Sequence, residues 1–288
     1  MCAKFVWNLL RPHIKLILTA SLILMIMLAL QAFWIEPSSL ITTKTNIRMQ
    51  HWPKQCSGLK VVVLADLHVG SPFNGLSNLK KVVRLTNQIN ADIILLAGDY
   101  VIHKVIGGKF VRPELIAREL KHLKAKLGVF AVLGNHDWWH SANQIKKAMT
   151  NEGISLLENN SIKLTKNNCD FWLAGISDYW GGHYDINRAL KNIPETAPII
   201  AFTHNPDIFY ELPPRIVITF AGHTHGGQVK LPLLGRTIVP SRYDDKFAIG
   251  HIEEYGRNMF VSSGIGTSIL PVRFGVPPEI SIIVLNSP

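Results

Sequence analysis

The chain has 288 residues and a net charge of +10, and it contains no internal repeat or low-complexity tract. A basic surface favours anionic partners: nucleic acid, anionic lipid headgroups or a phosphorylated substrate. Zinc-finger spacing, an RNP aromatic motif and an Arg-rich recognition helix are all absent. The sequence therefore excludes the common nucleic-acid modules and predicts no specific nucleic-acid partner.

The first predicted element is a membrane helix at residues 16–35. Its sequence, LILTASLILMIMLALQAFWI, is uncharged and long enough to cross the hydrocarbon core of a bilayer. A cleaved secretory signal is the alternative, but its apolar core is shorter, about 7–15 residues, and Ala29 and Ala32 do not give the small-x-small cleavage spacing. We therefore expect an uncleaved, single-pass anchor in the cytoplasmic membrane.

Basic residues flank this helix on both sides and bear on its orientation. Under the positive-inside rule, Lys4, Arg11 and Lys15 place residues 1–15 in the cytoplasm and the rest of the chain on the extracytoplasmic side. Basic residues also follow the helix, at Lys44, Arg48 and Lys54, so a domain on the cytoplasmic face stays open as an alternative. Attraction to anionic lipids is the economical explanation of the net charge.

Residues 36–57 contain Pro, Ser, Thr and scattered charges, which predicts a linker with room for one strand. The folded domain then occupies residues 58–288, a length that fits one large α/β domain with a substantial core. Cys56 and Cys169 allow at most one disulfide within it, and two free thiols are the simpler expectation.

The first half of this domain predicts a parallel sheet. Apolar, β-branched runs at 59–65, 93–97 and 129–133 indicate buried strands, and helices are expected near 77–89 and 113–124. The alternation of strand and helix is typical of an α/β fold.

The second half is expected to form another, mixed sheet packed against the first. A helix is predicted near 143–151. Short strands should follow at 162–164, 171–174, 199–203, 216–221, 259–262 and 280–285.

Polar segments follow directly on the predicted strands. They are Asp66-Leu67-His68, Gly98-Asp99, Gly134-Asn135-His136-Asp137, His204 and Gly222-His223-Thr224-His225. Ligands of open α/β sheets collect outside the carboxyl ends of the strands, so these side chains can converge. Imidazole nitrogens with Asp and Asn oxygens, and no Cys, suit divalent Mn, Fe or Zn. Taken singly, each segment could instead be a turn or a helix N-cap.

The order DxH, GD, GNH[DE], H, GHxH resembles the calcineurin-like metallophosphoesterases, from about residue 58 to the C-terminus. The resemblance implies a four-layer αββα sandwich of two mixed sheets with a dimetal cleft at one edge. A hydroxide held between two divalent ions would be the nucleophile, and the two oxygens of Asp99 would each bind one ion. The implied ligands are Asp66, His68, Asp99 and His225 for one ion and Asp99, Asn135, His204 and His223 for the other.

The same resemblance implies that His136 contacts the phosphate and protonates the leaving oxygen. Asp137 is predicted to be catalytic by orienting that imidazole. The alternative is that it supports a ligand residue through a hydrogen bond or caps the helix. Arg273 is a candidate for a phosphate contact. The pairs Trp138-Trp139 and Tyr179-Trp180 either form an apolar lip beside the site or pack under the sheet.

Histidines outside the motifs are expected mostly on the surface or on helices, and His103 is among them. His140 and His183 are near enough to motif or glycine segments to line the cleft.

Two stretches narrow the chemistry within the resemblance. Serine/threonine phosphatases have GDxVDRG, whereas residues 98–104 read GDYVIHK, which argues against a phosphoprotein substrate. Residues 222–228, GHTHGGQ, resemble a bacterial membrane-associated branch of the family instead. The glycines of this segment either let the backbone approach the substrate or form a tight turn with positive φ.

Together these features predict a membrane-anchored, metal-dependent hydrolase of a phosphodiester or pyrophosphate bond in a lipid-linked or nucleotide-linked substrate. Family enzymes that cleave the pyrophosphate of UDP-2,3-diacylglucosamine are an analogy for a role in glycolipid metabolism. The alternatives are a nucleic-acid or small-molecule phosphodiesterase, and a membrane protein that keeps its metals without turnover. The intact His136 argues against the last of these.

Overall fold

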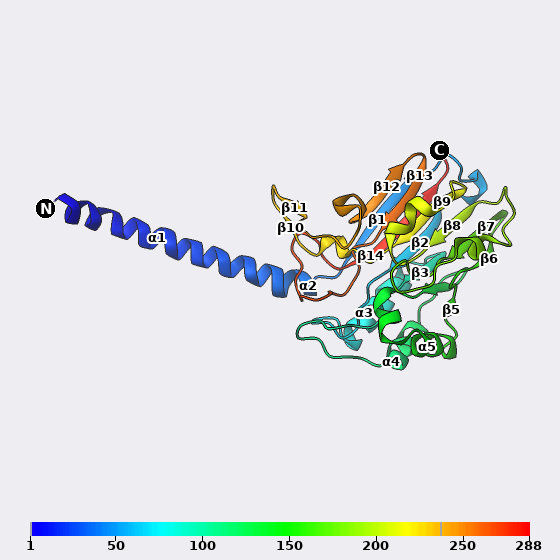
Figure 1. Ribbon diagram of the computed structural model, residues 1–288, viewed down its shortest axis with the longest axis horizontal. Coiled ribbons are helices and arrows are strands. Elements are labelled where there is room, and N and C mark those ends of the chain that lie inside the picture. Colours follow the sequence, from blue (N-terminus) through cyan, green and yellow to red (C-terminus); the bar gives the residue numbers. More distant parts are fainter. Residues whose placement is uncertain (1, 237) are drawn as a thin grey trace.

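The computed structural model describes residues 2–236 and 238–288, with side chains from residue 10 onward. Met1, Thr237 and the side chains of residues 2–9, including the Lys4 used to predict orientation, lie outside the described residues. A long helix, α1 (Cys2–Leu30), continues through η1 (Gln31–Ile35) and α2 (Glu36–Ser38) and projects from the folded domain (Figure 1). By length and composition, its residues 10–38 could cross a membrane.

The first sheet has six strands, and they are parallel except where β14 runs antiparallel to β2. In spatial order they are β1 (Ile41–Arg48), β14 (Glu279–Asn286), β2 (Leu59–Leu64), β3 (Ile93–Ala97), β4 (Val129–Val132) and β5 (Ser155–Leu156). β1 pairs with β14 along all eight of its residues, so the strand for which the predicted linker leaves room is an edge strand of this sheet.

The second sheet also has six strands, with parallel pairs at its centre and an antiparallel pair at each edge. In order they are β12 (Gly250–Glu254), β13 (Arg257–Val261), β9 (Ile216–Ala221), β8 (Ile199–Phe202), β7 (Cys169–Gly175) and β6 (Asn160–Lys166). The prediction that residues 280–285 join this sheet is wrong, because β14 inserts into the first one. An apolar run identifies a buried strand but not its partner.

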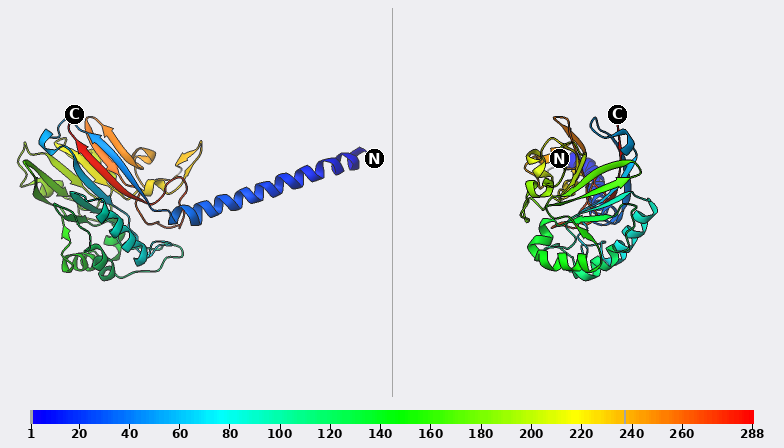
Figure 2. Two further views of the ribbon diagram at one scale, coloured as in Figure 1. Left: turned by 180° about the vertical axis from the view of Figure 1, so that it is seen from behind. Right: turned by 90° about the vertical axis from the view of Figure 1, so that its right-hand side faces the viewer.

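Helices cover the outer faces of both sheets (Figures 1 and 2). The first sheet packs against α3 (Leu76–Gln88), α4 (Pro113–Leu120) and α5 (Asn135–Asn151), and the second against α6 (Ile186–Leu190) and η3 (Pro206–Glu211). The short elements that remain are η2 (Lys54–Cys56), η4 (His225–Gly227), β10 (Lys230–Leu231), β11 (Gly235–Arg236) and η5 (Asp244–Phe247).

Alternate residues of each central strand enter different cores. Val61 and Val63 of β2 pack between the sheets with Phe202 and Phe220, whereas Val62 contributes to the core beneath the helices. Strands buried on both faces are apolar throughout, which explains their continuous runs in the sequence. The αββα sandwich expected from the resemblance is confirmed.

A disulfide joins Cys56, just before β2, to Cys169 at the start of β7, with 5.0 Å between the Cα atoms. It ties the first sheet to the second at the amino ends of their strands. The expectation of two free thiols is therefore wrong. The two cysteines are 113 residues apart, and their proximity depends on how the sheets stack, which the sequence does not reveal.

Candidate metal centre

The predicted ligand residues meet at the carboxyl ends of strands from both sheets. Asp66 follows β2 and Asp99 follows β3, while Asn135 begins α5 directly after β4. From the second sheet, His204 follows β8 and His223 follows β9. All five are buried, with at most 5% of their surface exposed.

One group forms around the imidazole of His68. Its Nε2 lies 3.1 Å from Nε2 of His225 and 3.4 Å from Oδ2 of Asp99, and Nε2 of His225 lies 3.4 Å from Oδ1 of Asp66. Nδ1 of His68 faces the carbonyl of Val101 at 3.1 Å. Because Nδ1 donates to that carbonyl, the lone pair of Nε2 is free to bind a cation.

A second group forms around His204. Its Nδ1 donates to the carbonyl of Ala97 at 2.7 Å. Its Nε2 lies 3.1 Å from Oδ1 of Asn135, 3.2 Å from Nδ1 of His223 and 3.3 Å from Oδ2 of Asp99. As in His68, Nδ1 is bound to a main-chain carbonyl, so the lone pair of Nε2 points at the other candidate ligands.

Asp99 connects the two groups through a single oxygen. Oδ2 faces His68 on one side and His204 on the other, at 3.4 and 3.3 Å. Oδ1 accepts the main-chain N–H of His136 at 2.8 Å. This arrangement differs from the expectation that each oxygen would serve one ion: Oδ1 is held by the main chain, and Oδ2 alone faces both imidazoles.

The electrostatics of the site favour neutral imidazoles at His68, His223 and His225 beside an ionised Asp99. Burial lowers the pKa of His68 to about 3 and holds the pKa values of His223 and His225 well below their usual range. Burial alone would raise the pKa of Asp99, but the imidazoles of His204 and His136 outweigh it and keep that pKa low. Neutral imidazoles and carboxylates are the forms that bind metal ions.

His204 is the member of the site where a proton would compete with a cation. Burial opposes its protonation, but the Asp99 carboxylate outweighs this and raises the pKa of His204 well above its usual range. Burial also raises the pKa of Asp66, to about 7. Among the described residues, no Lys or Arg forms an ion pair with either carboxylate, so the donor set fits divalent cations.

The backbone of the site adopts a conformation that is unusual outside glycine. Asp66, His68, Asp99, His223 and His225 all have positive φ, between 37° and 73°. Each such residue costs on the order of 1–3 kcal/mol, and strain of this kind concentrates at functional sites.

Motif glycines allow the ligand loops to touch. A Cβ atom on Gly222 would lie 2.6 Å from Oδ2 of Asp66, and one on Gly134 would lie 2.6 Å from the main-chain nitrogen of Asp99. In the GHTHGGQ segment, Gly226 and Gly227 have φ of 58° and 72°, which supports the tight-turn interpretation of that pair.

Asp137 has a different position from the one predicted. It is fully buried, and its carboxylate accepts main-chain N–H groups of Asp99 at 2.8 Å, Tyr100 at 2.9 Å and Gly134 at 2.9 Å. It makes no hydrogen bond to the imidazole of His136. The orienting role predicted for Asp137 is therefore corrected to the capping alternative: Asp137 caps α5 and holds the loop that carries Asp99.

His136 lies in a cavity of about 460 Å³ above the candidate ligands. Its Nε2 is 3.9 Å from Oδ2 of Asp99, and its ring packs 5.1 Å from that of Trp139. Trp180 packs edge-on against His223 at 4.4 Å. One tryptophan of each predicted pair thus forms a lip of the cavity, whereas Trp138 contacts Lys146 behind it.

Two cavity residues escaped the sequence analysis. The cavity is lined by His103 and Lys104, which follow the Gly98-Asp99 motif, and not by His140 or His183. The ring of His103 lies 5.9 Å from that of His136. His140 packs against Phe110 instead. His183 lines a different hollow, beside α6, so nearness in sequence to the motif segments did not place either histidine in the cavity.

Arg273 does not reach the cavity. Its side chain is fully buried and donates to the carbonyls of Val276 at 3.0 Å, Ser263 at 2.9 Å and Gly266 at 2.6 Å. The predicted phosphate contact is corrected to a structural role, in which the guanidinium holds the loops behind His225 together.

Asp178 is a further buried carboxylate that the sequence analysis missed. It follows β7 and accepts the main-chain N–H of Trp180 at 2.9 Å, which fixes the loop over His223. Burial raises its pKa. A polar residue directly after an apolar strand was the signal that identified Asp66 and Asp99, and it would have identified Asp178 as well.

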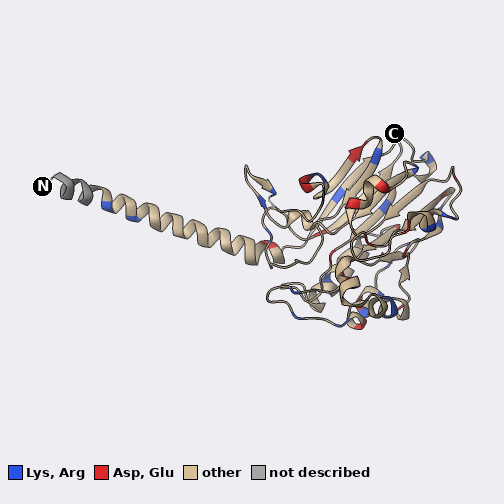
Figure 3. Ribbon diagram, viewed as in Figure 1, with Lys and Arg blue, Asp and Glu red and all other residues tan. Residues whose placement is uncertain are grey.

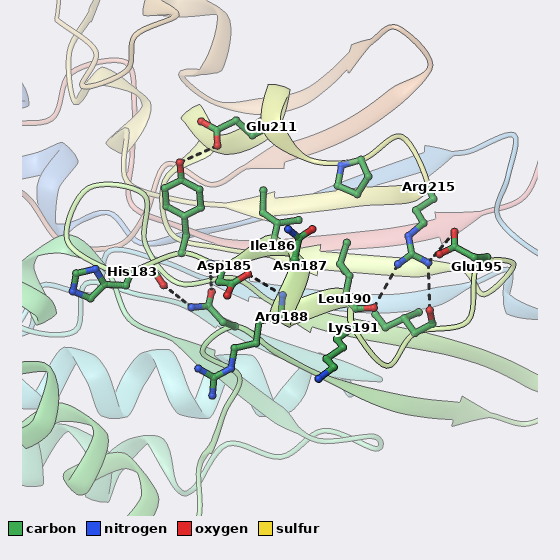
Figure 4. Close-up of a pocket in the computed structure, with 14 residues that line it drawn as sticks. His183, Asp185, Ile186, Asn187, Arg188, Leu190, Lys191, Glu195, Glu211 and Arg215 are labelled. Atoms are coloured by element: carbon green, nitrogen blue, oxygen red, sulfur yellow. Dashed lines mark hydrogen bonds and ion pairs between the residues drawn. The ribbon is translucent and has the colours of Figure 1, made fainter.

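A second hollow, of about 960 Å³, lies beside α6 (Figure 4). None of the candidate metal ligands lines it. Charged groups along its wall interact with one another: Arg215 lies 3.6 Å from Glu195, and the Tyr184 hydroxyl donates to Glu211 at 2.9 Å. We therefore assign the functional site to the cavity next to Asp99.

The family model for calcineurin-like phosphoesterases matches residues 59–227, the segment that carries all of these ligand groups. The chain belongs to the calcineurin-like phosphoesterase family. Membership identifies it as a phosphoester hydrolase, and the His and Asp clusters of the site indicate divalent metal binding.

Curated bacterial members of this family resemble the chain over most of its length. The uncharacterized metallophosphoesterase YkuE of Bacillus subtilis is 28% identical over 89% of each chain. The phosphodiesterase YaeI of Escherichia coli is 28% identical over 83% of this chain and 86% of its own. The UDP-2,3-diacylglucosamine pyrophosphatase LpxG of Chlamydia trachomatis is 27% identical over 86% of this chain and 90% of its own.

Proposed function

We propose that this protein is a membrane-anchored phosphoesterase that binds two divalent ions and hydrolyses a phosphodiester or pyrophosphate bond. The position of Asp99 carries the proposal, because its Oδ2 lies 3.4 Å from Nε2 of His68 and 3.3 Å from Nε2 of His204. One ion would be held by Asp66, His68, Asp99 and His225, and the other by Asp99, Asn135, His204 and His223. The donor set suits Mn, Fe or Zn.

Two bound ions would stabilise negative charge on the phosphoryl group and activate water. The chain itself supplies His136, which projects into the cavity 3.9 Å from Oδ2 of Asp99. Burial lowers the pKa of His136, so its protonated form gives up a proton readily to a leaving oxygen. General acid catalysis of this kind contributes about 10²–10⁴-fold in rate.

The substrate class is proposed from the cavity and the relatives. YaeI is named as a phosphodiesterase and LpxG as a pyrophosphatase, and in both kinds of substrate organic groups flank the phosphate or the diphosphate. Trp139 and Trp180 line the cavity and offer apolar surface to such groups. We propose a lipid-linked or nucleotide-linked substrate.

The disulfide is relevant to the side of the membrane on which the catalytic domain lies. Cys56 and Cys169 are buried and joined, and disulfides persist in oxidising compartments rather than in the cytosol. This supports a catalytic domain on the extracytoplasmic face, with α1 as its anchor. Alkaline phosphatase fused after Pro288 should be active in cells, and an inactive fusion in an intact protein would contradict this orientation.

The central test uses the full-length protein in detergent with Mn. We expect faster hydrolysis of bis-p-nitrophenyl phosphate than of the monoester, and two ions per chain by metal analysis. His136→Ala should lower kcat by about 10²–10⁴-fold with both ions retained. His122→Ala, at an exposed histidine away from the cavity, is the matched control. One ion per chain would contradict the bridging role of Asp99. No hydrolysis of either ester would contradict the proposed phosphoesterase activity.

A further inference from the structure

Three loops meet at the mouth of the cavity: residues 101–112, residues 226–236 with 238–240, and residues 264–275. Hydrogen bonds join them into one surface. The main-chain N–H of Ile106 donates to the carbonyl of Ile269 at 3.0 Å, and that of Lys230 donates to the carbonyl of Phe274 at 2.7 Å. The side chain of Gln228 accepts from the N–H of Ser268 at 2.7 Å.

These loops expose large aliphatic side chains, which we call the apolar rim. Its members are Ile106, Leu233, Leu234, Ile238, Ile269 and Leu270, with exposed fractions from 46% to 106%. Leu233 and Ile269 have φ of 67° and 61°, a conformation in which Gly, Asn or Asp would cost less. A loop that faces water has no reason to place exposed Leu and Ile there.

The membrane anchor ends against the same loops. The N–H of Arg273 donates to the carbonyl of Ala32 at 2.9 Å, and the N–H of Val276 donates to the carboxylate of Glu36 at 2.5 Å. In Figures 1 and 2, the β10–β11 hairpin and the loop before α4 lie at the end of the domain from which α1 leaves. An α1 that crosses a bilayer would therefore bring the apolar rim to its surface.

The charge of this surface suits anionic headgroups. None of the three loops contains Asp or Glu, whereas Lys104, Lys109 and Lys230 are exposed on them. Figure 3 shows blue segments on the hairpin at this end of the domain. Basic residues next to apolar ones favour an anionic lipid surface over a second copy of this basic chain.

The cavity opens within the apolar rim. Ile238 and Ile269 belong both to the rim and to the cavity wall, which they share with Lys104 and the proposed general acid His136. A molecule at the site would therefore extend past these two side chains.

We propose that the apolar rim inserts into the leaflet in which α1 anchors the domain. The site would then take an amphiphilic phosphodiester or pyrophosphate whose chains stay in the bilayer while its phosphate reaches the metal centre. This inference rests on the proposed function and names where the substrate of that site resides.

The test reconstitutes the full-length protein into phosphatidylcholine vesicles containing phosphatidylglycerol. Two substrates are compared: bis-p-nitrophenyl phosphate in water and hexadecyl p-nitrophenyl phosphate in the bilayer. The double variant Leu233→Asp/Leu234→Asp should keep the first rate within twofold and lower the second at least tenfold. Because α1 still anchors this variant, the loss would report rim insertion. Equal rates on both substrates in variant and wild type would overturn the inference.

Tyr255→Asp is the matched control. Tyr255 is 87% exposed with φ of 51°, but it lies in the turn before β13, at the end of the second sheet opposite the site. We expect this variant to keep both rates.

A fluorophore on Leu233→Cys, in a Cys2→Ser background, gives a readout that needs no catalysis. Quenching by spin-labelled lipids is expected. An unquenched label, or energy transfer only between copies, would overturn membrane insertion even in an active enzyme. If wild type cleaves neither diester while the label is quenched, the proposed function fails and the membrane contact stands.

Discussion

The two ends of the central strands are built in opposite ways. At the carboxyl ends, buried imidazoles and carboxylates face one another, and five of the candidate ligands have positive φ. At the amino ends, buried polar groups are paired: Asp92 accepts from the N–H of Lys60 at 2.9 Å and pairs with Lys126 at 3.0 Å and Lys166 at 2.6 Å. The disulfide lies at this second end.

Function is thus located at the carboxyl ends of the strands, and stabilising interactions are located at their amino ends. Strained ligand loops and converging lone pairs destabilise a fold unless a cation binds there. Cross-links between the sheets at the far end can offset that cost without touching the site. We therefore expect substitutions at the amino ends to lower stability with little effect on activity, and substitutions at the carboxyl ends to do the reverse.

The largest expected effect comes from Cys56→Ser/Cys169→Ser. The disulfide spans 113 residues, and a loop of that size contributes about 4–5 kcal/mol on the chain-entropy account. Urea unfolding should show this loss, with kcat unchanged while the protein stays folded. Cys2→Ser serves as the control and should change neither quantity. A large loss of kcat in the folded double variant would mean that the two ends are coupled.

Asp99→Asn tests the opposite end. A weaker bridging ligand should lower activity at least about 10²-fold, which corresponds to about 2.7 kcal/mol. Metal analysis should show fewer ions per chain. Full activity with two ions bound would show that Oδ2 of Asp99 is not the bridge.

More of the site than of the fold could be predicted from the sequence. Asp66, Asp99 and the later histidines could be placed because each follows an apolar strand, and strand ends converge in an α/β sheet. The partners of β14 and of the cysteines could not, since they depend on how the two sheets stack. The contacts of Asp137 match the capping alternative, and Arg273 donates to main-chain carbonyls instead of facing the cavity. A residue type predicts chemistry, whereas the groups it contacts decide its role.

Asp137 lies at the carboxyl ends of the strands but has a stabilising role, because its carboxylate holds the loop that carries Asp99. Asp137→Asn replaces one acceptor with an N–H group that faces main-chain donors. We expect metal affinity to fall about 10–100-fold, with activity largely restored by excess metal. Asp185→Asn, at the N-cap of α6, is the control. Lost kcat at saturating metal would instead give Asp137 a direct part in catalysis.

The smallest expected effect is a pH-dependent one at Asp92. Burial opposes its ionisation, but hydrogen bonds from Lys166 and from the N–H of Lys60 outweigh this and lower the pKa of Asp92 below 3.8. A carboxyl group with a lowered folded-state pKa stabilises the fold above its unfolded value, and this contribution is lost as the pH falls through the folded value.

Asp92→Asn should therefore cost about 1–1.5 kcal/mol at neutral pH. In urea titrations the difference from wild type should shrink once the pH drops below 3.8, the ordinary pKa of this carboxyl group. Activity should stay unchanged at neutral pH, since Asp92 precedes β3 whereas Asp99 follows it. A difference that stays constant with pH would show that Asp92 contributes through packing instead of charge. The disulfide and the apolar core would then be what stabilises the amino ends of the strands.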